Sequence, residues 1–153
     1  MTVHVLDTGA VLALLRSNPP RDLLDRLKQA DVDAVLIPSV VMIEVEQVRQ
    51  APKRRVERIL GLGDQDGLAD IAAVDERLAK RAADALRSLY SNRPKCPACS
   101  DLGRPNLVDA VVMALAAKHA ELDTPTSVQT QDVDDMEKLK DALCADVDVM
   151  RVS

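Results

Sequence analysis

The stretch that decides the fold is Val3-His4-Val5-Leu6-Asp7-Thr8-Gly9-Ala10. Its first four residues form a short uncharged run rich in β-branched side chains, which is typical of a strand buried on both faces. Thr8-Gly9 then begins a helix, so Asp7 is expected at the carboxyl end of a buried strand. In open parallel α/β sheets the functional crevice lies outside this end of the strands.

Short apolar runs and amphipathic segments alternate along the rest of the 153-residue chain. Strands are expected at residues 3–6, 34–37, 69–74, 127–130 and 147–152. Helices are expected at residues 8–16, 21–30, 53–60, 75–90, 106–120 and 132–143, with a further helix that Ser39 can cap. This alternation predicts a single α/β domain over residues 1–153, a three-layer α/β/α sandwich around a mostly parallel sheet.

Composition limits the class of protein further. Hydrophobic residues make up 47% of the sequence, but Phe and Trp are absent and there is one Tyr, so the core must be aliphatic. A net charge of −5 argues against a general electrostatic grip on nucleic acid, although a metal that faces phosphate brings its own positive charge. The sequence shows no signal peptide and no uncharged span for a membrane, so we expect a soluble cytoplasmic protein.

Three carboxylates each stand alone inside an otherwise uncharged apolar run: Asp7, Glu44 and Asp109. A lone ionised carboxylate in apolar surroundings costs several kcal/mol unless something compensates it. Asp132 follows the predicted 127–130 strand in the same way that Asp7 follows the first strand. Four acids from four segments can meet in one cleft and bind Mg²⁺ or Mn²⁺, which prefer hard oxygen ligands.

Helix capping is the alternative explanation for most of these acids. Asp7 can simply cap the helix that follows it, and Asp109 lies three residues after Asn106, as in a capping box. Asp132 and Asp135 have the same spacing. Glu44 lies too deep in its helix to cap, so its alternatives are an unpaired core position or a chance exposed one.

Four motifs resemble those of PIN-domain ribonucleases, in the same order and with similar separations. They are Val5-Leu6-Asp7-Thr8-Gly9-Ala10, Pro38-Ser39-Val40-Val41-Met42-Ile43-Glu44-Val45, Leu107-Val108-Asp109-Ala110-Val111-Val112-Met113-Ala114-Leu115-Ala116 and Thr130-Gln131-Asp132-Val133-Asp134-Asp135-Met136. The resemblance covers nearly the whole chain. The size and the lack of added domains are most similar to the VapC type, the toxin of bacterial toxin–antitoxin pairs.

The resemblance implies a magnesium- or manganese-dependent endoribonuclease that forms a homodimer. It also implies an antitoxin protein that inhibits the enzyme by burying a segment in the active groove. Asp7, Glu44, Asp109 and Asp132 would be the acidic quartet that holds the metal, and Thr130 would be a supporting hydroxyl with Asp135 near it. The alternative is a catalytically silent PIN-like module that uses the cleft to bind protein or RNA.

The chain departs from the PIN pattern at about residues 91–105, where an insertion contains Cys96-Pro97-Ala98-Cys99. A Cys-x-x-Cys pair can be half of a zinc site or a redox pair. Two reduced loop thiols are the simpler interpretation, because no second pair exists in the sequence.

Basic residues offer candidates for contact with an RNA substrate. Lys53-Arg54-Arg55 with Arg58 is the densest basic cluster, and Arg54 and Arg55 are candidate phosphate contacts. A run of this kind is more often simply a solvated helix face. Arg104 is a separate candidate because it lies close in sequence to Asp109.

Overall fold

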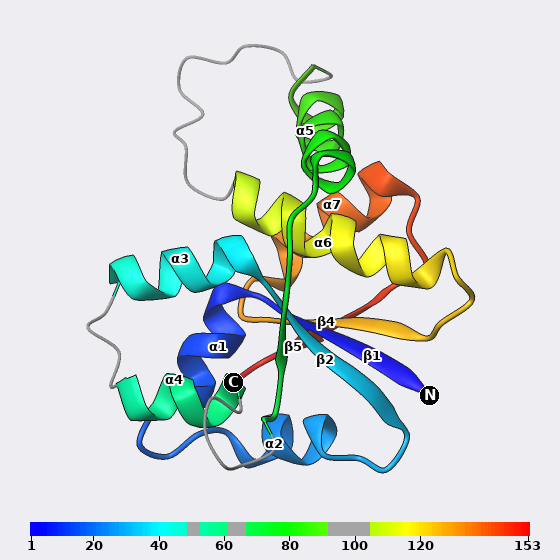
Figure 1. The fold of residues 1–153 in the computed structure, drawn as a ribbon. Coiled ribbons are helices and arrows are strands. Elements are labelled where there is room, and N and C mark those ends of the chain that lie inside the picture. The colour runs from blue at the N-terminus through cyan, green and yellow to red at the C-terminus, as the bar shows by residue number, and fades with distance from the viewer. Residues whose placement is uncertain (49–52, 61–66, 92–104) are drawn as a thin grey trace.

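A parallel five-stranded sheet forms the middle layer in the computed structural model, which describes residues 1–48, 53–60, 67–91 and 105–153 (Figure 1). Its strands lie side by side in the order β3-β2-β1-β4-β5, and all four neighbouring pairs are parallel. They are β1 (Thr2–Leu6), β2 (Val32–Pro38), β3 (Asp70–Ala72), β4 (Thr126–Thr130) and β5 (Asp148–Arg151). The predicted fold class is confirmed, and the third strand is shorter than the expected 69–74.

Helices cover both faces of this sheet. They are α1 (Thr8–Leu14), α2 (Arg21–Leu27), α3 (Ser39–Val48), α4 (Lys53–Leu60), α5 (Glu76–Ser91), α6 (Leu107–Ala120) and α7 (Val133–Leu143). In Figure 1, α5, α6 and α7 lie above the sheet, whereas α1, α2 and α4 lie below it. Helix α3 contacts both α1 and α6, so it joins the two helical layers. Among the described helices, none has the length and apolar character needed to span a membrane.

Helix α6 is deeply buried, as its strongly apolar sequence predicts. Every residue from Ala110 to Ala117 is buried, and the helix packs against α5, α7, β1 and β4. Its basic residues Lys118 and His119 are confined to the last turn. Because only five residues separate α6 from β4, the helix runs back against the strands, and its first turn lies over their carboxyl ends. Asp109 is in that first turn.

The order of the strands reverses at β1, since β2 and β3 lie on one side of it and β4 and β5 on the other. Such a reversal leaves a crevice between the carboxyl ends of the two strands that diverge, here β1 and β4. The Asp7 backbone N–H donates to the Gln129 carbonyl at 3.2 Å, which holds these two strand ends together. The sheet therefore places Asp7 beside Thr130 at the crevice.

A buried polar network links the neighbouring strands β1 and β4, three residues before Asp7. The His4 Nδ1 atom lies 2.6 Å from Ser127 Oγ, which also accepts a hydrogen bond from Gln129 Nε2 at 2.9 Å. Gln129 Oε1 in turn accepts from Arg26 Nε on α2 at 3.1 Å. The other ring nitrogen of His4 is buried without a hydrogen-bond partner among the described residues. Burial lowers the pKa of His4 below its usual 6.5, although a hydrogen bond with the Arg26 backbone opposes this, so the ring is neutral at pH 7.

Acid should therefore destabilise the protein through His4. The unfolded chain binds a proton at this site more readily than the folded chain does, so the stability from neutral His4 is lost as pH falls below 6.5. We expect the melting temperature of the wild type to fall relative to that of His4→Leu between pH 7 and pH 5. Thermal unfolding followed by circular dichroism measures this difference. Parallel curves for the two proteins would contradict a neutral buried His4.

Candidate active site

Asp7 is the centre of the candidate site. Its side chain is buried, with 5% of the residue exposed. Asp7 Oδ1 accepts a hydrogen bond from the Ala10 N–H at 2.6 Å, and Oδ2 accepts one from Thr130 Oγ1 at 2.5 Å. The capping alternative is thus observed, but the second oxygen is held by a residue 123 positions away. Burial raises the pKa of Asp7, while the hydrogen bond from Thr130 and those from backbone N–H groups oppose this rise.

Glu44 is held by a contact between two helices. It lies on α3, is half-buried, and accepts a short hydrogen bond from the hydroxyl of Thr8, the first residue of α1. Neither alternative for Glu44, an unpaired core position or a chance exposed one, is what the structure shows. The supporting role of Thr8 was not predicted, although its place directly after Asp7 was the available signal.

Asp109 combines a capping box with a place among the acids. Asn106 Oδ1 accepts from the Asp109 N–H at 3.0 Å, and Asp109 Oδ2 accepts from the Asn106 N–H at 2.9 Å. Burial, opposed by the Asn106 hydrogen bond and supplemented by the negative charges of Asp7, Glu44 and Asp135, raises the pKa of Asp109 to about 6. Three acids from other segments of the chain therefore act electrostatically on Asp109.

Asp132 is linked to Asp7 through Thr130. The Thr130 hydroxyl donates to Asp7 and accepts from the Asp132 backbone N–H at 2.9 Å. Asp132 is exposed and caps α7, since its Oδ1 accepts from the Asp135 N–H at 3.2 Å. Its charge contributes to the raised pKa of Asp7. The Thr130 hydroxyl therefore lies between the Asp7 carboxylate and the backbone N–H of Asp132.

Asp135 is a fifth acid, which the resemblance put near Thr130 but not in the metal-binding quartet. It is buried in the first turn of α7, and its Oδ1 lies 2.5 Å from the Lys138 ammonium. Its charge acts on Asp109, as noted above. The available signal was the spacing of three residues between Asp132 and Asp135, for which capping was one explanation.

The donor set of this acid cluster (Asp7, Glu44, Asp109, Asp132 and Asp135) fits a hard divalent cation. Every potential ligand is a carboxylate, and Mg²⁺ and Mn²⁺ prefer such oxygens. A bound cation would balance the negative charges of Asp7, Glu44 and Asp135 that act on Asp109. Within the described ranges, no three His, Cys, Asp or Glu side chains are already drawn together tightly enough to hold a metal ion. A cation would therefore have to draw the carboxylates inward.

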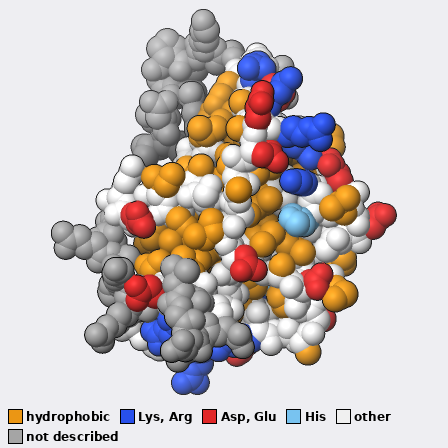
Figure 2. Space-filling view, in the orientation of Figure 1, with side chains coloured by type: hydrophobic (Ala, Val, Ile, Leu, Met, Phe, Trp, Pro, Cys, Tyr) orange, Lys and Arg blue, Asp and Glu red, His pale blue; other side chains and the backbone are white. Residues whose placement is uncertain are grey.

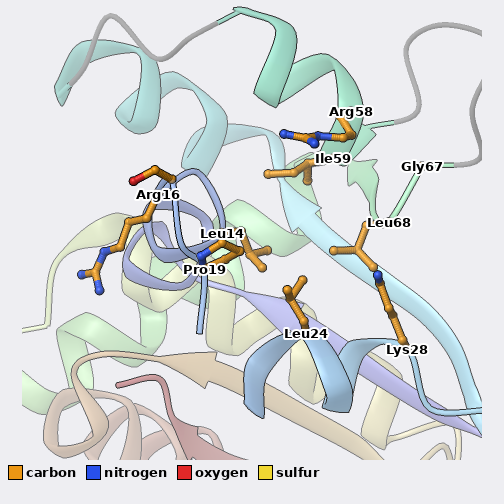
Figure 3. A pocket seen from close by; sticks show the side chains of 10 residues that line it. Leu14, Arg16, Pro19, Leu24, Lys28, Arg58, Ile59, Gly67 and Leu68 are labelled. Atoms are coloured by element: carbon orange, nitrogen blue, oxygen red, sulfur yellow. The ribbon is translucent and has the colours of Figure 1, made fainter. Parts of the chain in front are cut away.

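A cavity of about 520 Å³ lies away from the acid cluster, between α1, α2 and α4 (Figure 3). Leu14, Leu24 and Ile59 line its apolar floor, and Arg16, Lys28 and Arg58 add positive charge around it; none of the five acids lines it. Arg58 of the predicted basic cluster thus faces this cavity.

Several predicted residues lie outside the described part of the chain. These are the side chains of Arg54 and Arg55, and the residues Arg104, Cys96 and Cys99. On the face drawn in Figure 2, Lys and Arg gather at the upper right, over α5 and α7, and near α2 and α4 below. Hydrophobic side chains dominate the middle of this face.

Comparison with known proteins gives a consistent result. The family model for the PIN domain matches residues 4–140. Among solved structures, VapBC2 from Rickettsia felis bound to a promoter DNA fragment is similar with a TM-score of 0.68 at 11% identity, covering 99% of both chains. FitAcB from Neisseria gonorrhoeae is similar with a TM-score of 0.62 at 18% identity, covering 96% of both chains.

A third similar structure is VapC20 from Mycobacterium tuberculosis, a toxin that cleaves the sarcin–ricin loop. It has a TM-score of 0.51 at 17% identity, over 82% of this chain and 86% of that one. No curated protein matches the sequence significantly. At these identities the structural likeness shows the shared fold.

The raised pKa of Asp109 predicts a stability gain on its neutralisation. The folded chain holds a proton on Asp109 up to about pH 6, whereas the unfolded chain loses it near pH 3.8, so stability falls as pH rises through this window. Asp109→Asn keeps the capping acceptor, and above pH 6 it should stabilise the metal-free protein by about 1–2 kcal/mol after solvent screening. Thermal unfolding from pH 4 to 8 measures this gain.

The control is Asp134→Asn, which changes an exposed acid in the first turn of α7. The stability of this variant relative to the wild type should not increase between pH 4 and pH 6. A loss of stability in Asp109→Asn at pH 7.5 would mean that Asp109 is not repelled by its neighbours.

Proposed function

This chain belongs to the PIN-domain family, and on that premise we propose that it is a metal-dependent endoribonuclease that hydrolyses RNA phosphodiester bonds. The observation that carries the proposal is the raised pKa of Asp109, whose causes include the charges of Asp7, Glu44 and Asp135. The acids that act on Asp109 come from three other segments of the chain, which supports a shared site. A fold gains nothing in stability from such repulsion, so a function is the better explanation of it.

The proposed roles follow from the contacts of each side chain. Asp7, Glu44, Asp109 and Asp132 hold Mg²⁺ or Mn²⁺. The Thr130 hydroxyl fixes the rotamer of Asp7, and the Thr8 hydroxyl fixes that of Glu44. A bound divalent ion supplies positive charge for the scissile phosphate and lowers the pKa of a water molecule for in-line attack.

Proton transfer falls to carboxylates in this proposal. His4 is buried in the network with Ser127 and Gln129, and His119 lies in the last turn of α6, at the opposite end from Asp109. This leaves the carboxylates of the acid cluster as the groups that can exchange a proton.

We further propose that the enzyme is the toxin of a toxin–antitoxin pair, acting in the cytoplasm as a homodimer. Support comes from the structures that it resembles along almost its full length, which are named as VapBC and FitAcB assemblies, and from VapC20, which is named as a toxin. Restored growth on co-expression with a small protein encoded next to this chain would test the toxin role separately from the nuclease activity.

The central test is cleavage of structured RNA by the purified protein with Mn²⁺, Mg²⁺ or EDTA. We expect cleavage with either ion and none with EDTA, and Asp7→Asn should reduce the rate by about 100-fold or more. The exposed-acid variant Asp134→Asn should cleave at the wild-type rate. Cleavage that persists in EDTA or in Asp7→Asn would refute the catalytic assignment. RNA binding without cleavage by the wild type would instead favour the silent binding module.

Thr130→Val tests the proposed positioning of Asp7. Valine fills nearly the same volume, but it cannot donate to Asp7 Oδ2 or accept from the Asp132 N–H. We expect Mn²⁺ affinity and cleavage rate each to fall about tenfold, because a metal ligand has lost the group that orients it. Isothermal titration with Mn²⁺ measures the affinity. Thr126→Val, on the same strand but bonded to the Thr124 carbonyl, is the matched control.

A further inference from the structure

Among the described residues, Lys138 forms an ion pair with Asp135, a member of the acid cluster. Its ammonium lies 2.5 Å from Asp135 Oδ1, one turn earlier on α7. The Asp135 side chain is 6% exposed and that of Lys138 is 36% exposed, so the pair extends from the protein interior to the surface. Other ion pairs in these parts of the chain involve acids outside the cluster.

The position of Asp135 explains why it needs this cation. A buried carboxylate without a partner is strongly unfavourable, and Asp135 also faces the charge of Asp109. Asp132, which caps the same helix, is itself an acid and cannot compensate the negative charge of Asp135. The Lys138 ammonium is therefore a permanent positive charge at the α7 side of the cluster.

We propose that Lys138 takes the place of a second metal ion, so that the site binds one divalent cation per chain. This inference rests on the proposed function, since it concerns the same acids. In two-metal sites the ions lie about 3.5–4 Å apart and share carboxylates between them. A second ion on the α7 side would have to use Asp135, whose Oδ1 is already in contact with an ammonium that would repel the ion.

The chain provides a matched control on the same helix. Lys140 and Glu137 form an ion pair with the same spacing of three residues, at 3.7 Å. The Glu137 side chain is 45% exposed, and Glu137 is not among the charges that act on Asp7 or Asp109. Neutralising Lys140 changes the net charge of the protein and of α7 by the same amount as neutralising Lys138.

The experiment is Mn²⁺ titration of the metal-free protein, with free Mn²⁺ followed by electron paramagnetic resonance. We expect one bound Mn²⁺ per chain for the wild type, for Lys140→Gln and for Lys138→Arg. For Lys138→Gln we expect either a second bound ion or about tenfold tighter binding of the first, because a nearby positive charge has been removed. Two ions bound to the wild type, or Lys138→Gln titrating like Lys140→Gln, would overturn the inference.

A second variant keeps the inference testable if Lys138→Gln does not fold. Asp135→Asn removes the carboxylate and leaves the ammonium unneutralised beside the site, so Mn²⁺ affinity should fall about tenfold. Unchanged affinity would overturn the inference. If the wild-type protein binds two ions and cleaves RNA, the inference about Lys138 is refuted but the proposed function is not. Wild-type protein that neither binds Mn²⁺ nor cleaves RNA would refute the proposed function itself.

Discussion

The buried carboxylate of Asp7 is the constraint on which the rest of the site depends. An ionised group with 5% exposure is tolerated because the Ala10 N–H and the Thr130 hydroxyl each bond one of its oxygens. Those donors are available only if α1 begins directly after β1 and if β4 lies beside β1. The hydrogen bond from Thr130 thus ties Asp7 to the order of the strands, and a different strand order would leave Asp7 Oδ2 without this donor.

Periodicity and lone acids made most of the fold and part of the site predictable. The strand-helix alternation gave the sandwich, because both periods are visible in a local window. Asp7, Glu44 and Asp109 stood out because each interrupts an apolar run. Thr130 could be assigned only through the family resemblance, since the contact that gives it a role spans 123 residues. No local pattern reports such a contact.

Capping and cluster membership proved to be compatible explanations, and treating them as alternatives hid part of the site. Asp7, Asp109 and Asp132 each cap a helix and still act electrostatically within the cluster. A helix N-terminus offers N–H groups that stabilise a carboxylate, so it is a favourable place to keep several acids close together. Asp135 was placed near Thr130 only through the resemblance, because its spacing from Asp132 already had a sufficient local explanation.

The site and the stability of the protein are coupled through charge. Burial and mutual repulsion raise the pKa values of Asp7 and Asp109, so the ionised cluster opposes folding when no cation is present. A divalent cation that binds the folded chain alone reverses this effect by mass action. The chain carries a net charge of −5, so a bound cation also supplies the local positive charge that an RNA phosphate requires. The same ion would thus relieve the repulsion within the protein and attract its substrate, which explains how an acidic protein can act on a polyanion.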